Sequence, residues 1–194
     1  MIKVILYVTL TIVSAANTFG QNSGFMPGYL VTKSYDTIHG YIKYANQFPY
    51  RILPDIKFKE TEKSKNVKYT PTEIHGYKAG DKIFHSMETR DIYEPMLFME
   101  LVIDGFVKLY NYSKVTNTGG GLSNSPSIGM QSIDYLVKGV DKTLFPVSDG
   151  KFKEQLSNYF ADNLELAEQI RNGDLKEKDI QLVVRNYNIW KLTH

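Results

Sequence analysis

The sequence predicts an α+β fold in which an N-terminal antiparallel β meander, or partly open barrel, precedes a C-terminal cap of two to three helices. As far as residue 138, apolar and polar residues alternate in short runs that Gly, Pro and Asp interrupt, which is typical of half-buried strands. From Ser148 the apolar period changes from two to about 3.6, the period of a helix. Strands first and helices last favour an antiparallel sheet with the helices on one face or at one end.

The first hairpin is expected where the regular pattern begins. Residues 28–32 and 37–44 predict two strands, and residues 34–36 supply the polar turn between them. In the second strand Ile38 falls on one face and His39 on the other, as alternation requires. Shorter strands are expected to follow at 55–59, 67–70, 74–79 and 82–87.

The strongest hairpin signal lies in the middle of the chain. Residues 96–103 and 106–112 are separated by Asp104-Gly105, a favoured two-residue type I′ turn. Residues 113–127 contain three consecutive glycines and almost no apolar side chains, so they predict a mobile loop. A closing strand is expected at 128–138.

The C-terminal part predicts helices at 149–160 and 164–171 and a third that begins at Asp174 or Lys176. Asn172-Gly173 is a typical stop for the second helix. The residues expected to anchor the core are Leu97, Leu101, Val107, Leu109, Leu156, Phe160, Val183 and Tyr187.

The N-terminus predicts an export signal. Lys3 supplies a short positive region, residues 4–13 are apolar apart from two threonines, and small residues follow at 14–16. Cleavage is expected after Ala16 or, slightly preferred, after Gly20. The alternatives are an N-terminal core strand or a membrane anchor that is left uncut.

The expected organisation is therefore a signal peptide at 1–20, a β-rich domain at 21–147 and a helical cap at 148–194, with the last two forming one folding unit. No second long apolar segment follows the leader, so no membrane span is expected after cleavage. The chain contains no cysteine, which excludes a lipoprotein anchor, disulfides and thiolate metal sites. The protein is expected to be exported, either periplasmic or on the cell surface.

The charge balance argues against nucleic-acid binding. Lys and Arg number 23 against 21 Asp and Glu, a formal net charge of +2, whereas a phosphate-backbone partner requires a concentrated basic face. The densest basic run comprises Lys57, Lys59, Lys63, Lys65 and Lys68. Because Glu60 and Glu62 interleave with it, a solvated face is its expected role.

The search for catalytic and metal residues centres on two histidines. His39 and His75 occupy equivalent positions in two Ile-His-Gly-Tyr segments, and together with Asp36 or Glu73 they would offer three metal ligands. The spacing is not a recognised ligand pattern, so histidines on the polar face of a strand are expected instead.

Other site signatures are missing. His85 and His194 add no ligand spacing, no Gly-x-Ser-x-Gly occurs, and Gly119-Gly-Gly121 lacks the Lys-Ser/Thr of a P-loop. The sequence thus assigns no catalytic, cofactor-binding or metal-binding residue and implies no cofactor.

Tyrosine is abundant, with 14 residues, and seven of them lie between residues 29 and 77. One interpretation is a tyrosine-rich sheet face that binds a carbohydrate or a protein, since tyrosine combines an apolar body with a polar tip. The other, which is favoured, is half-buried strand tyrosines that cover the sheet without any ligand. The seven are Tyr29, Tyr35, Tyr41, Tyr44, Tyr50, Tyr69 and Tyr77.

The segments 28–32 and 36–42 resemble the opening of a family of uncharacterised exported proteins of Bacteroidota-type bacteria, with its Gly-Tyr-Ile-Val strand and Asp-Thr-Ile-x-Gly-Tyr-Ile hairpin. The similarity continues through 54–59, 69–77, 100–112 and 184–188. Relatives often carry lysine where this chain has His39 and His75. The resemblance implies an envelope location and transfers no catalytic residue.

Taken together, these features predict a non-enzymatic binding or structural module of a Gram-negative envelope, with an envelope protein or a glycan as partner. One alternative is a carbohydrate or small-ligand binding domain that uses the tyrosine face and the 113–127 loop. The other is a hydrolase of envelope polymers, which requires a concave site where acids or histidines converge.

Overall fold

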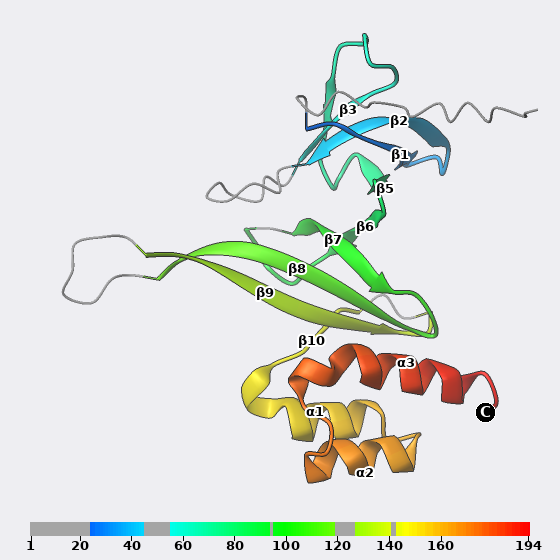
Figure 1. Ribbon diagram of the computed structural model, residues 1–194, viewed down its shortest axis with the longest axis vertical. Coiled ribbons are helices and arrows are strands. Elements are labelled where there is room, and N and C mark those ends of the chain that lie inside the picture. The colour runs from blue at the N-terminus through cyan, green and yellow to red at the C-terminus, as the bar shows by residue number, and fades with distance from the viewer. Residues whose placement is uncertain (1–23, 45–54, 94, 119–126, 141–142) are drawn as a thin grey trace, which may run out of the picture.

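The computed structural model describes residues 24–44, 55–93, 95–118, 127–140 and 143–194 (Figure 1). The expected leader at 1–20 with both candidate cleavage sites, Tyr50, and the glycine triplet at 119–121 lie outside these ranges.

The described part of the chain forms an open, ten-stranded sheet in which every neighbouring pair is antiparallel, followed by three α-helices. The predicted α+β class is therefore confirmed. The strand order is β10-β9-β8-β7-β6-β5-β1-β2-β3-β4. The strands are β1 (Met26–Thr32), β2 (Thr37–Tyr44), β3 (Ile56–Lys59), β4 (Val67–Tyr69), β5 (Ile74–Ala79), β6 (Lys82–Glu88), β7 (Met96–Ile103), β8 (Val107–Thr118), β9 (Ser127–Lys138) and β10 (Phe145–Pro146).

The sheet consists of two meanders joined through β1. The first runs from β1 to β4, and the second runs from β5 to β10. The chain leaves the edge strand β4 and returns to the other side of β1, where Leu30 lies opposite Tyr77 on β5. Glycine permits the close approach of the β1 and β5 backbones here, because a Cβ at Gly28 would overlap the carbonyl oxygen of Lys78.

The expectation of a loop over 113–127 is wrong for its first six residues. β8 continues to Thr118 and pairs with β9 from Ser113–Ser132 to Thr118–Ser127. Figure 1 shows β8 and β9 as a long twisted ribbon whose far end reaches beyond the rest of the sheet. Ser127, the last residue of the expected loop, begins β9, and residues 119–126 lie outside the described residues.

The helices are α1 (Phe152–Tyr159), α2 (Leu164–Asn172) and α3 (Ile180–Lys191), with short 3-10 turns before α1 and α3. The Asn163 side chain caps α2 by accepting a hydrogen bond from the Leu166 amide at 3.1 Å. Gly173 ends α2 in the left-handed region, with φ of 89°. Among the described residues, no helix combines the length and the hydrophobicity that crossing a bilayer requires.

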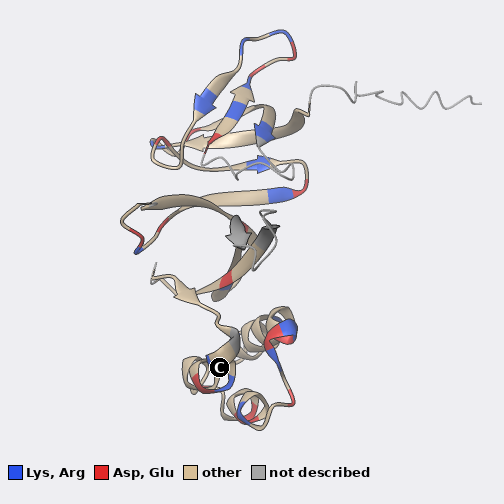
Figure 2. Cartoon of the chain, turned by 90° about the vertical axis from the view of Figure 1, so that its left-hand side faces the viewer, with Lys and Arg blue, Asp and Glu red and all other residues tan. Residues whose placement is uncertain are grey.

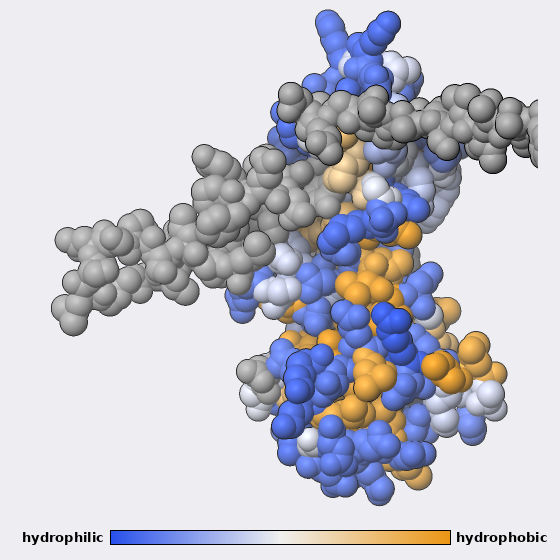
Figure 3. Space-filling model, in the orientation of Figure 1, coloured by the Kyte–Doolittle hydropathy of each residue, from blue (hydrophilic) through white to orange (hydrophobic). Residues whose placement is uncertain are grey.

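The largest core lies between the helices and one face of β8 and β9, as Figure 1 shows. It joins strand residues such as Val107 and Leu136 to helix residues such as Leu156, Phe160 and Tyr187, all fully buried or nearly so. On the face shown in Figure 3, hydrophobic residues reach the surface mainly in the middle and lower parts of the molecule.

Two smaller cores lie on opposite faces of the sheet. In the N-terminal half, Leu30, Ile42 and Phe84 belong to a core enclosed by β1 to β6. In the C-terminal half, a second cluster lies on the face opposite the helices and consists of Leu97, Met99, Tyr110, Tyr112 and Val137.

Seven of the eight expected core anchors are buried in these clusters. Leu101 is the exception, because it is only partly buried at the margin of the cluster that contains Leu97. The pairing of β7 with β8 shifts register between Leu101 and Ile103, and this irregularity accompanies its incomplete cover.

Candidate functional site

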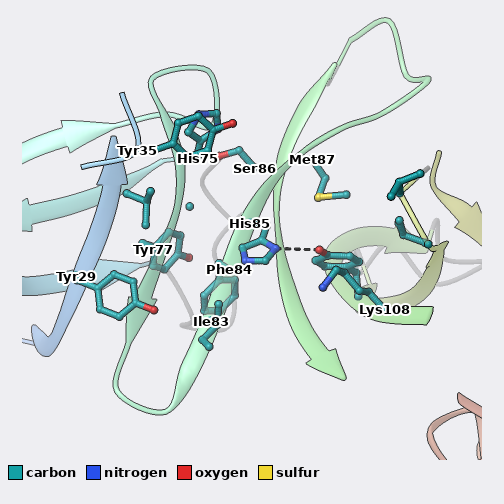
Figure 4. Close-up of a pocket in the computed structure, with 16 residues that line it drawn as sticks. Tyr29, Tyr35, His75, Tyr77, Ile83, Phe84, His85, Ser86, Met87 and Lys108 are labelled. Carbon is teal, nitrogen blue, oxygen red and sulfur yellow. Dashed lines mark hydrogen bonds between the residues drawn. The ribbon is translucent and has the colours of Figure 1, made fainter. Parts of the chain in front are cut away.

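A cleft of about 450 Å³ opens where the sheet passes from its N-terminal to its C-terminal half. Its walls come from β1, β5 and β6 on one side and from β8 and β9 on the other (Figure 4). Because many of its lining side chains are aromatic, we name it the aromatic cleft. This volume is in the range of small-molecule sites. The lining residues used below are Tyr29, Tyr35, His75, His85, Lys108 and Tyr110.

His85 and Tyr110 form a hydrogen-bonded pair inside the cleft. Nδ1 of His85 lies 2.9 Å from the hydroxyl oxygen of Tyr110, and the rings are 5.7 Å apart (Figure 4). Burial, followed by the charge of Lys108, lowers the pKa of His85. Burial, followed by the charge of Asp104, raises the pKa of Tyr110 to about 12. Both groups are therefore uncharged at neutral pH, and the pair offers neutral donors and acceptors.

A charged pair stands beside this neutral one. Lys108 lies on β8 and forms an ion pair with Asp104, four residues earlier at the β7–β8 turn. The hydrogen bond from Lys108 is the main reason that the pKa of Asp104 is lowered. Lys108 points toward the same part of the cleft as His85 (Figure 4), so one end of the cleft carries a cation whose counter-ion lies outside it.

The other end of the cleft is formed by a stacked pair of rings. Tyr35 stacks on His75 with 4.1 Å between ring centroids and an interplanar angle of 24°. Tyr35 is 72% exposed, and its φ of 67° lies in the left-handed region that non-glycine residues seldom adopt. Strained backbone of this kind is often found at functional sites.

The β1–β2 turn holds Tyr35 in this conformation. The Asp36 amide donates to the Thr32 hydroxyl oxygen at 3.1 Å, and the Ser34 hydroxyl donates to the Asp36 carboxylate at 2.6 Å. The Thr32 amide also donates to the Asp36 carbonyl oxygen at 2.9 Å. The ring of Tyr35 is therefore presented by a well-bonded turn.

A second hollow, which we name the shallow groove, adjoins the cleft. It is lined by residues of β1, β2 and β5, among them His39, Tyr41 and Lys78, and has a volume of about 610 Å³. Tyr29 lines both the shallow groove and the aromatic cleft. Its ring makes an edge contact with His39 at 5.8 Å, so the two hollows meet at this tyrosine.

The structure does not bring His39 and His75 together. His39 lies opposite Tyr29 on β1, and β1 separates β2 from β5. Each imidazole contacts a different tyrosine, Tyr29 for His39 and Tyr35 for His75. No group of three metal-ligating side chains converges within the described ranges.

The tyrosines of the N-terminal half do not share one face. Tyr77 is buried and stacks on Phe84 at 4.6 Å, and Tyr69 packs against the same core. Tyr29 and Tyr41 lie on the opposite face, in the shallow groove. The interpretation of strand tyrosines as cover thus fits Tyr69 and Tyr77, whereas Tyr29, Tyr35 and Tyr41 line hollows.

His85 and Tyr110 were not singled out by the sequence as site residues. The two lie 25 positions apart and meet only because β6, β7 and β8 are consecutive neighbours in the sheet. The period-two pattern of β6 does place Ile83, His85 and Met87 on one face, but a single histidine in such a pattern carries no ligand signal.

Comparisons with family models, with curated proteins and with solved structures gave no match to this chain.

Proposed function

We propose that this protein is an exported, non-enzymatic module of the cell envelope that binds a carbohydrate ring in the aromatic cleft. The observation that carries the proposal is the composition of the cleft: ring faces at one end and a neutral, hydrogen-bonded His85–Tyr110 pair at the other. A sugar ring has the matching chemistry, with apolar C–H faces and a rim of hydroxyl groups. Pockets with apolar walls and a few placed polar groups are typical of small-ligand sites.

The neutral state of the polar pair supports a hydroxyl-bearing ring at this position of the cleft. An imidazole and a phenol that are both uncharged can each donate or accept, which suits hydroxyls that do both. Since His85 Nδ1 faces Tyr110, the Nε2 atom is the imidazole position left for a ligand. A half-buried polar pair of this kind loses little by exchanging water for sugar hydroxyls.

The exported location rests on the sequence. The positive start, short apolar run and small residues of the first twenty positions are typical of a secretory leader. Fractionation of the native host, with crosslinking before lysis, tests this part. Recovery in the periplasm or at the surface supports it, and recovery in the cytoplasm contradicts it.

A binding role is favoured over hydrolysis of envelope polymers. The hydrolase alternative needs His39 and His75, or a pair of acids, to converge in a concave site. His39 and His75 lie on strands that β1 separates, and the one carboxylate that acts on His85 electrostatically, Asp104, is 67% exposed and ion-paired with Lys108.

Glycan binding by the whole mature chain and by two cleft variants tests the function. Tyr35→Gly removes the stacking ring and relieves the positive φ, so it should keep or raise stability while weakening binding about tenfold. Tyr110→Phe removes only the hydroxyl that bonds His85 and should weaken binding about five- to tenfold.

Tyr93→Gly is the matched control, because Tyr93 is 88% exposed and does not line the aromatic cleft. This variant should bind each glycan of a screening array as the wild type does. Equal binding by all three variants and the wild type, or no glycan bound by the wild type, would overturn the proposal.

A further inference from the structure

Three lysines stand in a row across the β2–β3–β4 region, and we name them the lysine row. The strand registers pair Lys43 on β2 with Lys57 on β3, and pair Lys57 with Lys68 on β4. Residues directly opposite in an antiparallel pair have Cβ atoms about 5 Å apart on the same face of the sheet. The three lysines are therefore neighbours on one face of the sheet.

Such a row is unfavourable for the fold by itself. Like charges directly opposite one another destabilise a sheet. Lys68 forms an ion pair with Asp55, a carboxylate that is 8% exposed. Lys57 stands between two lysines, and in the described part of the chain no carboxylate is paired with it. Lys57 is therefore the lysine at which like charges meet from both neighbouring strands.

The same face of the sheet carries two more lysines and leads to the cleft. Lys59 on β3 lies opposite Tyr41, which precedes Lys43 by two residues on β2. The Nζ atom of Lys59 is 5.6 Å from the Tyr41 ring centroid. Lys78 lies opposite Tyr29, across β1 from His39. Figure 2 shows lysines on several adjacent strands in this half of the molecule.

From the lysine row to the aromatic cleft, the face therefore presents cations and rings in alternation. Tyr41 and Lys78 line the shallow groove, Tyr29 joins that groove to the cleft, and Lys108 stands at the far end. Glu60 is the acidic residue that lines the groove. Neighbouring strands are about 4.8 Å apart, so the path from β3 to β6 is on the order of 20 Å long.

We propose that the ligand is an acidic oligosaccharide, several linked rings with carboxylate groups, that extends from the aromatic cleft along the shallow groove to the lysine row. This inference rests on the proposed function and adds the ligand's charge and length to it. One terminal ring occupies the cleft, and the carboxylates of the following rings neutralise Lys78, Lys59 and the lysine row. Binding thereby offsets the repulsion between Lys57 and the lysines on either side of it.

An acidic glycan fits this face better than a nucleic acid does. The chain as a whole has a formal net charge of only +2, which is small for a protein that binds a phosphate backbone. The described face offers lysines and no arginine, and arginine is the side chain that best grips phosphate in two-point contacts. Single-stranded DNA is the alternative ligand, and the test below includes it.

The test is calorimetric titration of the mature protein with tetragalacturonate and with a hyaluronan tetrasaccharide, each compared with its fully methyl-esterified, uncharged form. The acidic chains should bind at least fivefold more tightly, and the difference should shrink as NaCl is raised. The double variant Lys57→Gln/Lys78→Gln should lose about five- to tenfold in affinity for the acidic chains only.

Lys63→Gln/Lys65→Gln makes the same change in net charge in the exposed β3–β4 loop and should leave both affinities within twofold of the wild type. Lys57→Gln alone should raise the melting temperature of the free protein by about 1–3 °C, because it breaks the lysine row.

Each failure has a distinct meaning. Equal binding of acidic and uncharged chains, equal losses in the two double variants, failure of both acidic chains to bind, or tighter binding of oligo(dT) than of the acidic chains would overturn this inference. If the wild type still binds glycans and Tyr35→Gly still weakens that binding, the proposed function stands without the acidic ligand. If Tyr35→Gly and Tyr110→Phe change nothing, the proposed function itself fails.

Discussion

The two halves of the sheet bury their side chains in different ways. In the N-terminal half, one face encloses a small core around Leu30 and Ile42, and the other carries lysines, tyrosines and His39. In the C-terminal half both faces are covered, one by the helices and the other by the cluster around Met99 and Tyr110. In the part of the chain that the structure describes, the open face thus lies where the helices and this cluster end.

Strand β6 is where the two arrangements meet. Phe84 points into the N-terminal core, whereas His85 lines the aromatic cleft and Met87 packs against the C-terminal cluster. Side chains of this one strand therefore lie in three environments: the N-terminal core, the aromatic cleft and the C-terminal cluster. The cleft is a consequence of this change of buried face, because neither core extends across it.

The largest effect is expected in the helix-covered half. Phe160→Ala removes a fully buried ring from the core between the helices and the sheet and should cost about 3–5 kcal/mol of unfolding free energy in urea titration. Leu164→Ala, four residues later and 76% exposed, is the control and should change stability by less than about 0.5 kcal/mol. Similar losses in both would show that the helices do not pack as described.

A smaller loss is expected where the backbones of β1 and β5 approach closely. Gly28→Ala places a Cβ against the backbone of β5, which cannot yield as a flexible side chain does, and should cost about 1–3 kcal/mol. Gly150→Ala has no neighbouring atom within 4 Å of the new Cβ and should be nearly neutral. Thermal melts of the two variants compare them directly, and a stable Gly28→Ala protein would contradict the pairing of β1 with β5.

An acid-sensitive contact ties the sheet to the helices. Burial alone would raise the pKa of Asp162, but hydrogen bonds from Tyr187 and Lys138 together with the Lys138 charge outweigh it and lower the pKa. A carboxylate with a lowered pKa stabilises the fold above its unfolded pKa of about 4, and the stabilisation is lost as pH falls through the folded value.

Asp162→Asn should therefore be less stable than the wild type at neutral pH, and the gap should narrow below about pH 4. Tyr187→Phe removes the 2.5 Å hydrogen bond to Asp162. When Asp162→Asn is made in this background, the loss of stability at neutral pH should be smaller than in the wild type. Urea midpoints measured against pH provide the comparison, and a gap that stays constant with pH would argue against the contact.

The cleft adds a pH dependence in a different range. Because burial and Lys108 lower the pKa of His85, the unfolded chain binds a proton there more readily than the folded one. Stability should then decrease as pH falls below about 6.5, and His85→Gln should be free of this decrease. The groups that act on this imidazole are Lys108, Asp104 and Tyr110. Parallel pH profiles of both proteins would show His85 to be solvated instead.

Much of the fold could be predicted from local pattern. The alternation in 74–79 and the Asp104-Gly105 signal place β5, β7 and the start of β8 correctly, since these signals depend on neighbours in sequence. Neither Asp104 nor Gly105 adopts the positive φ of the expected type I′ turn. The pairing of β5 with β1 is not local, so no pattern within either strand announces it. Residues 113–118 look like loop because they contain almost no apolar side chains, although their backbone pairs with β9.

The site was less predictable than the fold. His39 and His75 attract attention through a repeated tetrapeptide, yet β1 separates their strands. The lysine row is invisible in sequence, where Lys43 lies far from Lys57 and Lys68, and it appears only when the strand registers are known. Cleft, groove and row all depend on which strands are neighbours, which single-strand patterns do not encode.

Imidazole nitrogen–proton NMR spectra of the mature protein, recorded during titration with tetragalacturonate, test the central claim most directly. The four histidines are natural reporters, since His75 and His85 line the aromatic cleft, His39 lines the shallow groove and His194 stacks on Trp190 at the far end of α3. We expect saturable shifts of His85 and His75, a smaller shift of His39, and none of His194. Shifts confined to His194, or four unchanged histidines, would contradict a ligand site in the cleft.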